Sequence, residues 1–469
     1  MAYPGDISLR SGRGRGILVA TVLASGMAFL DGTVVNVALP TIGRELGATV
    51  AGLQWIVTAY LLTLSAFVLL GGSLGDVLGR KRVFIAGTLA FAATSAACGA
   101  APSLTVLWLA RALQGVAAAL LVPGSLAILK NCFRPEDQDR AVGAWTGLSG
   151  VTTAAGPLVG GWLVEALSWR AIFFLNLPLA LAAVCAAARC FPADHGEARG
   201  VDWRGAAFAA VALGGTAYAL IEGPARGWPR SALVGAALGG GALTAFLGWE
   251  RRAAEPMLPL DLFRRRQFTA ANLTTFTLYF ALSAAMFLVM LGLQQGLGYG
   301  PLGASLVLLP LAAITLVLSP AAGRLAHAVG YRLPMTIGSV VAGTGLLLVG
   351  AVGLPGRSLG SLVAGVVVFA LGLGLTVAPL TAAVMAAVEE RDAGIASGVN
   401  NAVARVAGLL GVAILPGLGG LSEAESGERF LSSIGAGLLA TAAVTMTGGL
   451  VAWVGMSRRA PRVRAAREA

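Results

Sequence analysis

Two charged residues stand inside stretches that are otherwise apolar. Asp31 lies in the sequence LDGTVVNVALP (residues 30–40), and Arg111 lies in the apolar stretch 104–127. A charged side chain near the centre of a bilayer costs about 2.5 kcal/mol or more, so a functional role is the expected reason for its presence. A buried carboxyl group beside a guanidinium can gain and lose a proton when their separation changes. This residue pair is therefore suited to proton coupling.

The spacing predicts that these two groups lie at the same depth in a membrane. If the first span runs outward and ends near Leu39, Asp31 lies about 12 Å below the outer boundary at 1.5 Å per residue. If the fourth span runs inward from Leu104, Arg111 lies about 10 Å below that boundary. A buried charge normally finds a partner or a water-filled cavity, so we predict that the two side chains face each other or share a cavity. The alternative is a static pair that only fixes the register of two helices.

Further polar residues recur on single helix faces. Thr33 and Asn36 are three residues apart and are expected to line a cavity or, more often in such positions, to bond a neighbouring helix. In a later apolar stretch, Ser397, Asn401 and Arg405 recur every four residues and form one polar stripe. Arg405 lies about 15 Å from the inner end of that stretch. We therefore expect it to line a cavity or to lie between bundles.

Composition indicates that these segments lie in a membrane rather than in water. Hydrophobic residues make up 57% of the 469 residues and charged residues 12%, and the mean hydropathy is +0.81. A soluble domain carries about 25% charged residues. Apolar runs of about 20 residues recur, which indicates helices rather than the strands of a membrane barrel. We predict an all-α polytopic membrane protein with no cleavable signal peptide, in which the four scattered cysteines are packing residues.

Fourteen apolar segments are predicted to span the membrane. Their approximate cores are 17–39, 52–73, 83–100, 104–127, 141–164, 171–190, 205–222, 231–249, 269–294, 303–322, 334–353, 359–387, 394–417 and 431–456. With the N-terminus inside, 25 of the 33 Lys and Arg fall in cytoplasmic segments and six in outer loops, as the positive-inside rule requires. Both termini are therefore predicted to be cytoplasmic, at the plasma membrane. The net charge of +11 is assigned to anionic lipids of the inner leaflet rather than to nucleic acid, because no soluble basic domain is evident.

An internal repeat divides the chain. The sequence GSLGDVLGRK (residues 72–81) recurs in outline as GRLAHAVGYR (residues 323–332), each between two spans. Two related six-helix bundles are implied, at 1–199 and at 267–469, the second with a basic cytoplasmic tail. The two remaining spans form an insertion with linkers at 200–266, which is expected to pack peripherally. Parallel repeats of this kind suit a transporter that rocks about a site at the membrane midplane.

The first copy of this repeat has the chemistry of a loop at the inner headgroups. Gly79 permits a sharp turn, and Asp76 and Arg80 are four residues apart, within reach of an ion pair. Alone, these features indicate a topology anchor. In the second copy His327 replaces the acid, and it could sense pH near neutrality, although an exposed loop histidine is more often incidental. The residues of this loop are Gly72, Asp76, Gly79, Arg80 and Lys81.

The fifth span carries small residues at a spacing of three and four, namely Gly143, Gly147, Gly150, Ala154 and Gly161. Such spacing makes one face smooth and allows another helix to approach closely. Pro157 removes a backbone hydrogen bond and should bend the helix just beyond that contact. Two acids at outer span ends, Glu165 and Glu222, are expected to be solvated surface residues.

Taken in order, the motifs resemble those of the fourteen-span drug:proton antiporter family of the major facilitator superfamily. The likeness covers nearly the whole chain and is carried by LDGTVVNVALP, GSLGDVLGRKR, the fourth-span Arg111-Ala-Leu-Gln114-Gly115, the fifth-span stretch from Gly147 to Gly161 with Gly156-Pro157, Trp169-Arg170 through Asn176-Leu-Pro178, and Ser397-Gly398-Val-Asn400-Asn401 with Arg405.

The resemblance implies a major facilitator fold and a role for each motif. Asp31 would be the proton or substrate group and Arg111 its modulator, while the loop around Asp76 would latch the two bundles in the outward-facing state. The cavity or helix-packing polar residues would be Thr33, Asn36, Gln114, Asn401 and Arg405. The motif associated with exporters rather than importers comprises Gly147, Gly156, Pro157, Gly160 and Gly161.

We therefore expect a proton-coupled exporter, or antiporter, of lipophilic or amphipathic organic compounds, of the multidrug efflux type found in antibiotic resistance. Its partners would be a small-molecule substrate, protons and lipid, and it would act as a monomer without cofactor, metal or enzymatic activity. A dedicated exporter of one natural product or metabolite would share every motif. A channel or scaffold is a different class, and the single acid argues against a channel, which favours rings of like charge. The charge of the substrate stays open, because Asp31 suits a cation whereas Arg111 and Arg405 suit an anion or a neutral polar group.

Overall fold

The computed structural model of the chain describes residues 5–192, 194, 196, 200–253, 256–354, 356, 358–389, 392–421 and 427–457. The predicted basic tail and three arginines used in the charge count, at 199, 357 and 391, lie outside these residues.

The described chain is helical, and its only strand-like pairing is one isolated bridge between Ile7 and Phe133. The helices of the first half are α1 (Gly12–Leu46), α2 (Val50–Leu78), α3 (Arg80–Gly99), α4 (Leu104–Cys132), α5 (Pro135–Ala166), α6 (Ala171–Phe174) and α7 (Asn176–Cys190). The insertion holds α8 (Trp203–Ala225), α9 (Arg230–Glu250) and η1 (Leu260–Arg264). The second half holds α10 (Arg266–Leu291), η2 (Gly292–Gly296), α11 (Pro301–Val307), α12 (Leu309–Val329), α13 (Arg332–Leu348), η3 (Val349–Gly353), α14 (Leu359–Ala386), α15 (Ala393–Leu418) and α16 (Gly427–Gly455).

Every predicted core lies within one helix, or within two consecutive helical segments, and extends at most one residue beyond its end. In the described part of the chain, thirteen of these helical spans are long and apolar enough to cross a membrane. The remaining one is α5, which is 32 residues long but carries the glycines, serines and threonines of the fifth-span motif. The prediction of an all-α membrane protein is confirmed.

Local chemistry explains where the helices begin and end. The side chains of Ser11, Thr49 and Ser103 each accept a backbone N–H bond from the first turn of α1, α2 and α4, which satisfies donors that a helix start leaves unpaired. Gly47 ends α1 with φ +64°, a conformation that glycine adopts without steric penalty.

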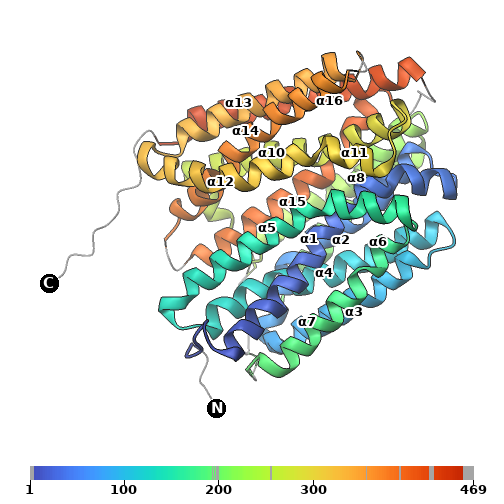
Figure 1. Cartoon of the computed structure of the whole chain (residues 1–469). Coiled ribbons are helices and arrows are strands. Elements are labelled where there is room, and N and C mark those ends of the chain that lie inside the picture. The colour runs from blue at the N-terminus through green and yellow to red at the C-terminus, as the bar shows by residue number, and fades with distance from the viewer. Residues whose placement is uncertain are drawn as a thin grey trace.

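The helices form two bundles that lie side by side, the blue to green helices α1–α7 in one and the yellow to red helices α10–α16 in the other (Figure 1). The bundles meet where α1 packs on α10, α2 on α15, and α5 on α11 and α12. In the insertion, α9 packs on α8, whereas α8 contacts both α2 and α15. Only α9 is therefore peripheral in the sense expected, since α8 touches both bundles.

Candidate functional site

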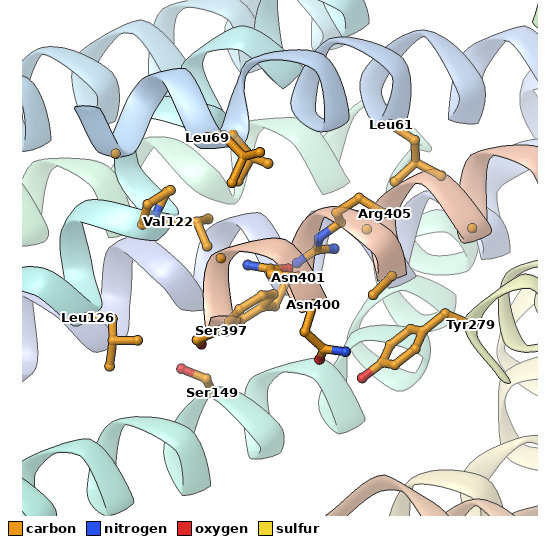
Figure 2. Close-up of a pocket in the computed structure, with 18 of the residues that line it drawn as sticks. Leu61, Leu69, Val122, Leu126, Ser149, Tyr279, Ser397, Asn400, Asn401 and Arg405 are labelled. Carbon is orange, nitrogen blue, oxygen red and sulfur yellow. The ribbon is translucent and has the colours of Figure 1, made fainter. Parts of the chain in front are cut away.

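A cavity of about 1430 Å³ lies between the two bundles. It is lined by residues from α1, α2, α4, α5, α10, α14 and α15 and from the segments next to the insertion, and Figure 2 shows its central part. Its lining reaches the exposed side chains Lys130 and Ile395 at the end that carries the Asp76 turn. The cavity therefore opens at that end of the molecule.

Asp31 and Arg111 form an ion pair in which the two side chains are 0% and 1% exposed. Gln114 joins the pair, because its Nε2 donates to Asp31 Oδ1 at 3.1 Å while its Oε1 accepts from Arg111 Nη1 at 2.7 Å. Arg111 Nε also donates to the carbonyl of Ile56 at 3.2 Å. Each charge thus has hydrogen-bond partners that offset part of the free-energy penalty of its burial.

The carboxylate of Asp31 lies one side chain away from the cavity. Asp31 is not among the lining residues, whereas Gly32, Tyr60 and Arg111 are. The guanidinium of Arg111 lies over the ring of Tyr60, 4.3 Å from its centroid, which adds a cation–π contact. A change in the position of Arg111 or Tyr60 would expose the acid to the cavity.

Thr33 and Asn36 line the cavity from α1. Thr33 Oγ1 donates to the carbonyl of Leu30 at 2.9 Å and lies 3.4 Å from the carbonyl oxygen of Thr153 in α5. Asn36 Nδ2 donates to the carbonyl of Gly32 at 3.1 Å, but the buried Asn36 Oδ1 has no hydrogen-bond partner among the described residues. Thr33 therefore both lines the cavity and bonds a neighbouring helix, the two alternatives expected from the sequence. Asn36 lines the cavity and has one side-chain acceptor without a partner among the described residues.

The polar stripe of α15 faces the same cavity. Ser397, Asn401 and Arg405 all line it, and Figure 2 shows them on one side of this helix. The guanidinium of Arg405 lies 5.5 Å from the ring centroid of Phe29 in α1. Asn400, next to the stripe, donates to Asn272 Oδ1 at 3.2 Å and Thr275 Oγ1 at 2.7 Å, and so binds α15 to α10.

The predicted gating loop is shorter than expected. Residues 72–78 continue α2, so Gly79 alone makes the turn, with φ +91°. Arg80 Nη2 lies 2.7 Å from Asp76 Oδ1, the ion pair that the spacing indicated. Gly330 has φ +88° at the matching position of the second copy, so the repeat extends to the backbone.

The remaining loop residues bind within the N-terminal bundle. Lys81 Nζ donates to the carbonyls of Ala188 and Phe191 near the end of α7, at 2.9 and 3.0 Å. Gly72 and Asp76 line the cavity mouth. His327, in the second copy, is exposed and lies against Tyr331.

The glycines of α5 divide into two groups, and this corrects the single smooth face that was predicted. A side chain at Gly156 or Gly160 would collide with α1, and one at Gly161 would collide with α11. Around Gly143 and Gly147 there is open space. The close approach is therefore confined to the half of α5 that contains Pro157.

Amide side chains close the cavity at the end opposite its mouth, and sequence reasoning missed them. Gln54 Nε2 in α2 donates to the carbonyls of Val412 and Ala413 in α15, at 2.7 and 3.2 Å. Gln294 Nε2 in η2 donates to the carbonyl of Val37 in α1 at 2.9 Å. A glutamine within an apolar run was the available signal, but its partners are backbone groups that no spacing reveals.

One of the two acids predicted to be solvated is buried. Glu222 Oε1 accepts from Trp55 Nε1 at 2.8 Å, and its side chain, 9% exposed, pairs with Arg226 at 2.9 Å. The expectation of a surface residue is wrong there, because α8 packs on α2. Glu165 is exposed, yet its Oε2 accepts the backbone N–H of Leu302 across the bundle interface at 3.0 Å.

Comparisons with known proteins agree with this architecture. Residues 21–412 match the family described as the Major Facilitator Superfamily. The chain is 36% identical to "Multidrug resistance protein Stp" of Mycobacterium tuberculosis, over 85% of this chain and 74% of that protein. It is 33% identical to the "Tetracenomycin C resistance and export protein" of Streptomyces glaucescens, over 88% and 77%.

Among solved structures, a bacterial homologue of the human lysosomal transporter Spinster, in an inward-facing and unoccupied conformation, matches with a TM-score of 0.69 at 14% identity, covering 95% of this chain and 97% of that one. This likeness shows the fold. Together with the sequence match over most of the chain, it leads to one conclusion: the chain belongs to the major facilitator superfamily.

Proposed function

We propose that this protein is a proton-coupled exporter of lipophilic or amphipathic organic compounds and that Asp31 is its proton-binding group. The observation that carries the proposal is one buried carboxylate, paired with Arg111 and Gln114 directly behind the side chains that line a central cavity. Relatives named for resistance and export support the outward direction. The motif order further supports the fourteen-span drug:proton antiporter family.

The ion pair provides a means of coupling. Protonation of Asp31 from outside removes its negative charge, so its hold on Arg111 weakens and the network that these two residues share with Gln114 can rearrange. In the inward-facing state the proton leaves to the cytoplasm and the ion pair forms again. The membrane potential contributes about 2.3 kcal/mol per charge per 100 mV to this inward proton movement, before any pH gradient is counted.

Alternating access would exchange the open and closed ends of the cavity. With the termini in the cytoplasm, as the basic residues predict, the mouth near Asp76 opens inward. Gly161 packs on α11 at the closed end, whereas Gly143 and Gly147 have open space. In the outward-facing state Gly143 and Gly147 would pack against the other bundle. The turn at Gly79, with its Asp76–Arg80 pair, would then act as a latch.

A dedicated exporter of a single natural product is the second candidate. The match to a protein named for one compound, tetracenomycin C, favours it as much as the match to Stp favours a multidrug pump. The two candidates share the coupling mechanism. Transport of a broad substrate panel separates them, since a dedicated exporter moves one chemical class.

The decisive test is transport into proteoliposomes with an imposed pH gradient, using aromatic cations, neutral compounds and anions. The native chain should accumulate at least one class, and Asp31→Asn should lose gradient-driven accumulation while it keeps part of its counterflow exchange. Asp261→Asn is the matched control, because it removes a carboxylate that is 87% exposed, and it should behave as the native chain. A gradient response that survives in Asp31→Asn excludes this residue from coupling.

A further inference from the structure

Charged side chains reach the central cavity at two levels. Asp76, Lys130 and Asp202 line the cavity near its mouth. Farther in, the charged lining residues are Arg111 and Arg405. Arg405 lies twelve residues into the 26-residue helix α15, which is about 18 Å from its start and close to its middle.

The two inner arginines differ in whether a carboxylate neutralises their positive charge. The charge of Arg111 is neutralised by Asp31, whose two oxygens are engaged by Arg111 and Gln114. Arg405 has no carboxylate within ion-pair distance among the described residues, and its guanidinium lies over the ring of Phe29. A cation–π contact contributes about 0.5–2 kcal/mol. The middle of the cavity therefore carries one uncompensated positive charge.

The surroundings of Arg405 resemble a binding site more than a structural contact. Asn401 and Ser397 continue the polar face of α15, and Tyr279 lines the same cavity from α10 (Figure 2). Apolar side chains such as Leu61 complete the wall. The planar fork of a guanidinium binds carboxylates through two parallel hydrogen bonds, which a point charge cannot do.

We propose that the compound exported through this cavity is an organic anion, an aromatic or polycyclic molecule whose carboxylate or similarly acidic oxygen binds Arg405. The inference rests on the export function proposed above and assigns the charge of its substrate. The acidic group of the ligand would be the anionic partner that the guanidinium of Arg405 lacks among the described residues. At 1430 Å³ the cavity exceeds the range of about 300–1,000 Å³ that is usual for small-molecule sites, so several fused rings fit.

The proposal has an electrical consequence. Exchange of one inward proton for one outward monovalent anion moves two charges in the same electrical direction, whereas exchange for a monovalent cation moves none. At 100 mV, inside negative, the potential then contributes about 4.6 kcal/mol to each anion exported, at about 2.3 kcal/mol per charge. A potassium and valinomycin diffusion potential should therefore drive anion export without a pH gradient.

The experiment uses the full chain in lipid nanodiscs and three probes that share one ring system, namely anthraquinone-2-carboxylate, its methyl ester and 2-(aminomethyl)anthraquinone. Calorimetric titration of the native protein should show at least tenfold tighter binding of the carboxylate than of the ester. Arg405→Met should abolish that preference and leave the affinity for the ester within twofold, and Arg405→Lys should restore part of it. Lys130→Met, which removes a cation at the mouth, should keep it.

Three outcomes overturn the proposal. The first is tightest binding of the aminomethyl compound by the native chain, and the second is an equal loss for all three probes in Arg405→Met. The third is loss of the preference in Lys130→Met, which would assign it to the general positive field. Failure of the export function is a separate result, because it shows as the absence of any response to pH gradient in native proteoliposomes, whatever the order of binding.

Discussion

Arg111 and Arg405 face one cavity from opposite bundles, yet their surroundings are opposite. Arg111 is 1% exposed and is held by Asp31, Gln114 and the carbonyl of Ile56. Arg405 is partly buried, and it has a ring below it and no acid beside it in the described part of the chain. The guanidinium of Arg111 is therefore bonded within its own bundle, to Asp31, Gln114 and the carbonyl of Ile56. The guanidinium of Arg405 has no acidic partner in the described structure and can bind a group in the cavity.

The largest loss of stability is expected when the ion pair between Asp31 and Arg111 is broken. Arg111→Met leaves the carboxylate of Asp31 buried without its cation, and breaking a buried pair from one side costs about 3–5 kcal/mol. Chemical unfolding in detergent micelles measures the loss. The double variant Asp31→Leu with Arg111→Met should recover most of it, because no uncompensated charge remains.

Arg405→Met is the counterpart of that variant in the other bundle. It removes a guanidinium that has no acidic partner in the described structure, so the stability lost should stay below about 1 kcal/mol, the range of an exposed cation–π contact. A loss as large as that of Arg111→Met would remove the contrast between the two arginines.

An intermediate effect is expected from Gln114, which bonds both members of the pair. Gln114→Leu removes one donor to Asp31 and one acceptor for Arg111, and unsatisfied buried groups cost about 1–3 kcal/mol. The control is Asn401→Leu, since Asn401 lines the cavity and its side-chain amide makes no hydrogen bond within the described residues. Equal unfolding midpoints for the two variants would show that the amide does not support the pair.

A modest loss of stability is also expected from a change at Tyr60. Tyr60→Phe keeps the ring against Arg111 and removes only the hydroxyl, which donates to the carbonyl of Ala28 at 3.3 Å. We expect a loss of about 0.5–1.5 kcal/mol, the net contribution of one hydrogen bond. Tyr60→Leu also removes the cation–π contact and should be less stable than Tyr60→Phe in the same unfolding assay.

Depth arithmetic was enough to predict that Asp31 meets Arg111, because a helix has a fixed rise per residue and both charges were counted from the same boundary. Periodicity likewise predicted the stripe that ends at Arg405. The small residues of α5 were visible too, but their spacing is the same at both ends of the helix. Which end is closed depends on the state of the whole molecule, and that information is not local.

The contacts of Gln54, Gln294 and Glu222 were beyond prediction for a different reason. Gln54 and Gln294 bond backbone carbonyls on the opposite bundle, and every residue has a carbonyl, so no residue type marks the partner. Glu222 bonds Trp55, from which it is separated by 167 positions in the chain. Sequence patterns identify the faces of helices, and the partner across a face follows only from tertiary packing.

Helix α8 has a consequence for the route by which compounds dissolved in the bilayer reach the interior. It lies against α2 and α15 and covers the seam between them, with Glu222 bonded to Trp55 of α2. The other seam, where α5 passes α11 and α12, has no such cover in the described residues. A compound dissolved in the bilayer would therefore meet α8 at the seam between α2 and α15. At the seam between α5 and the helices α11 and α12 it would meet no covering helix.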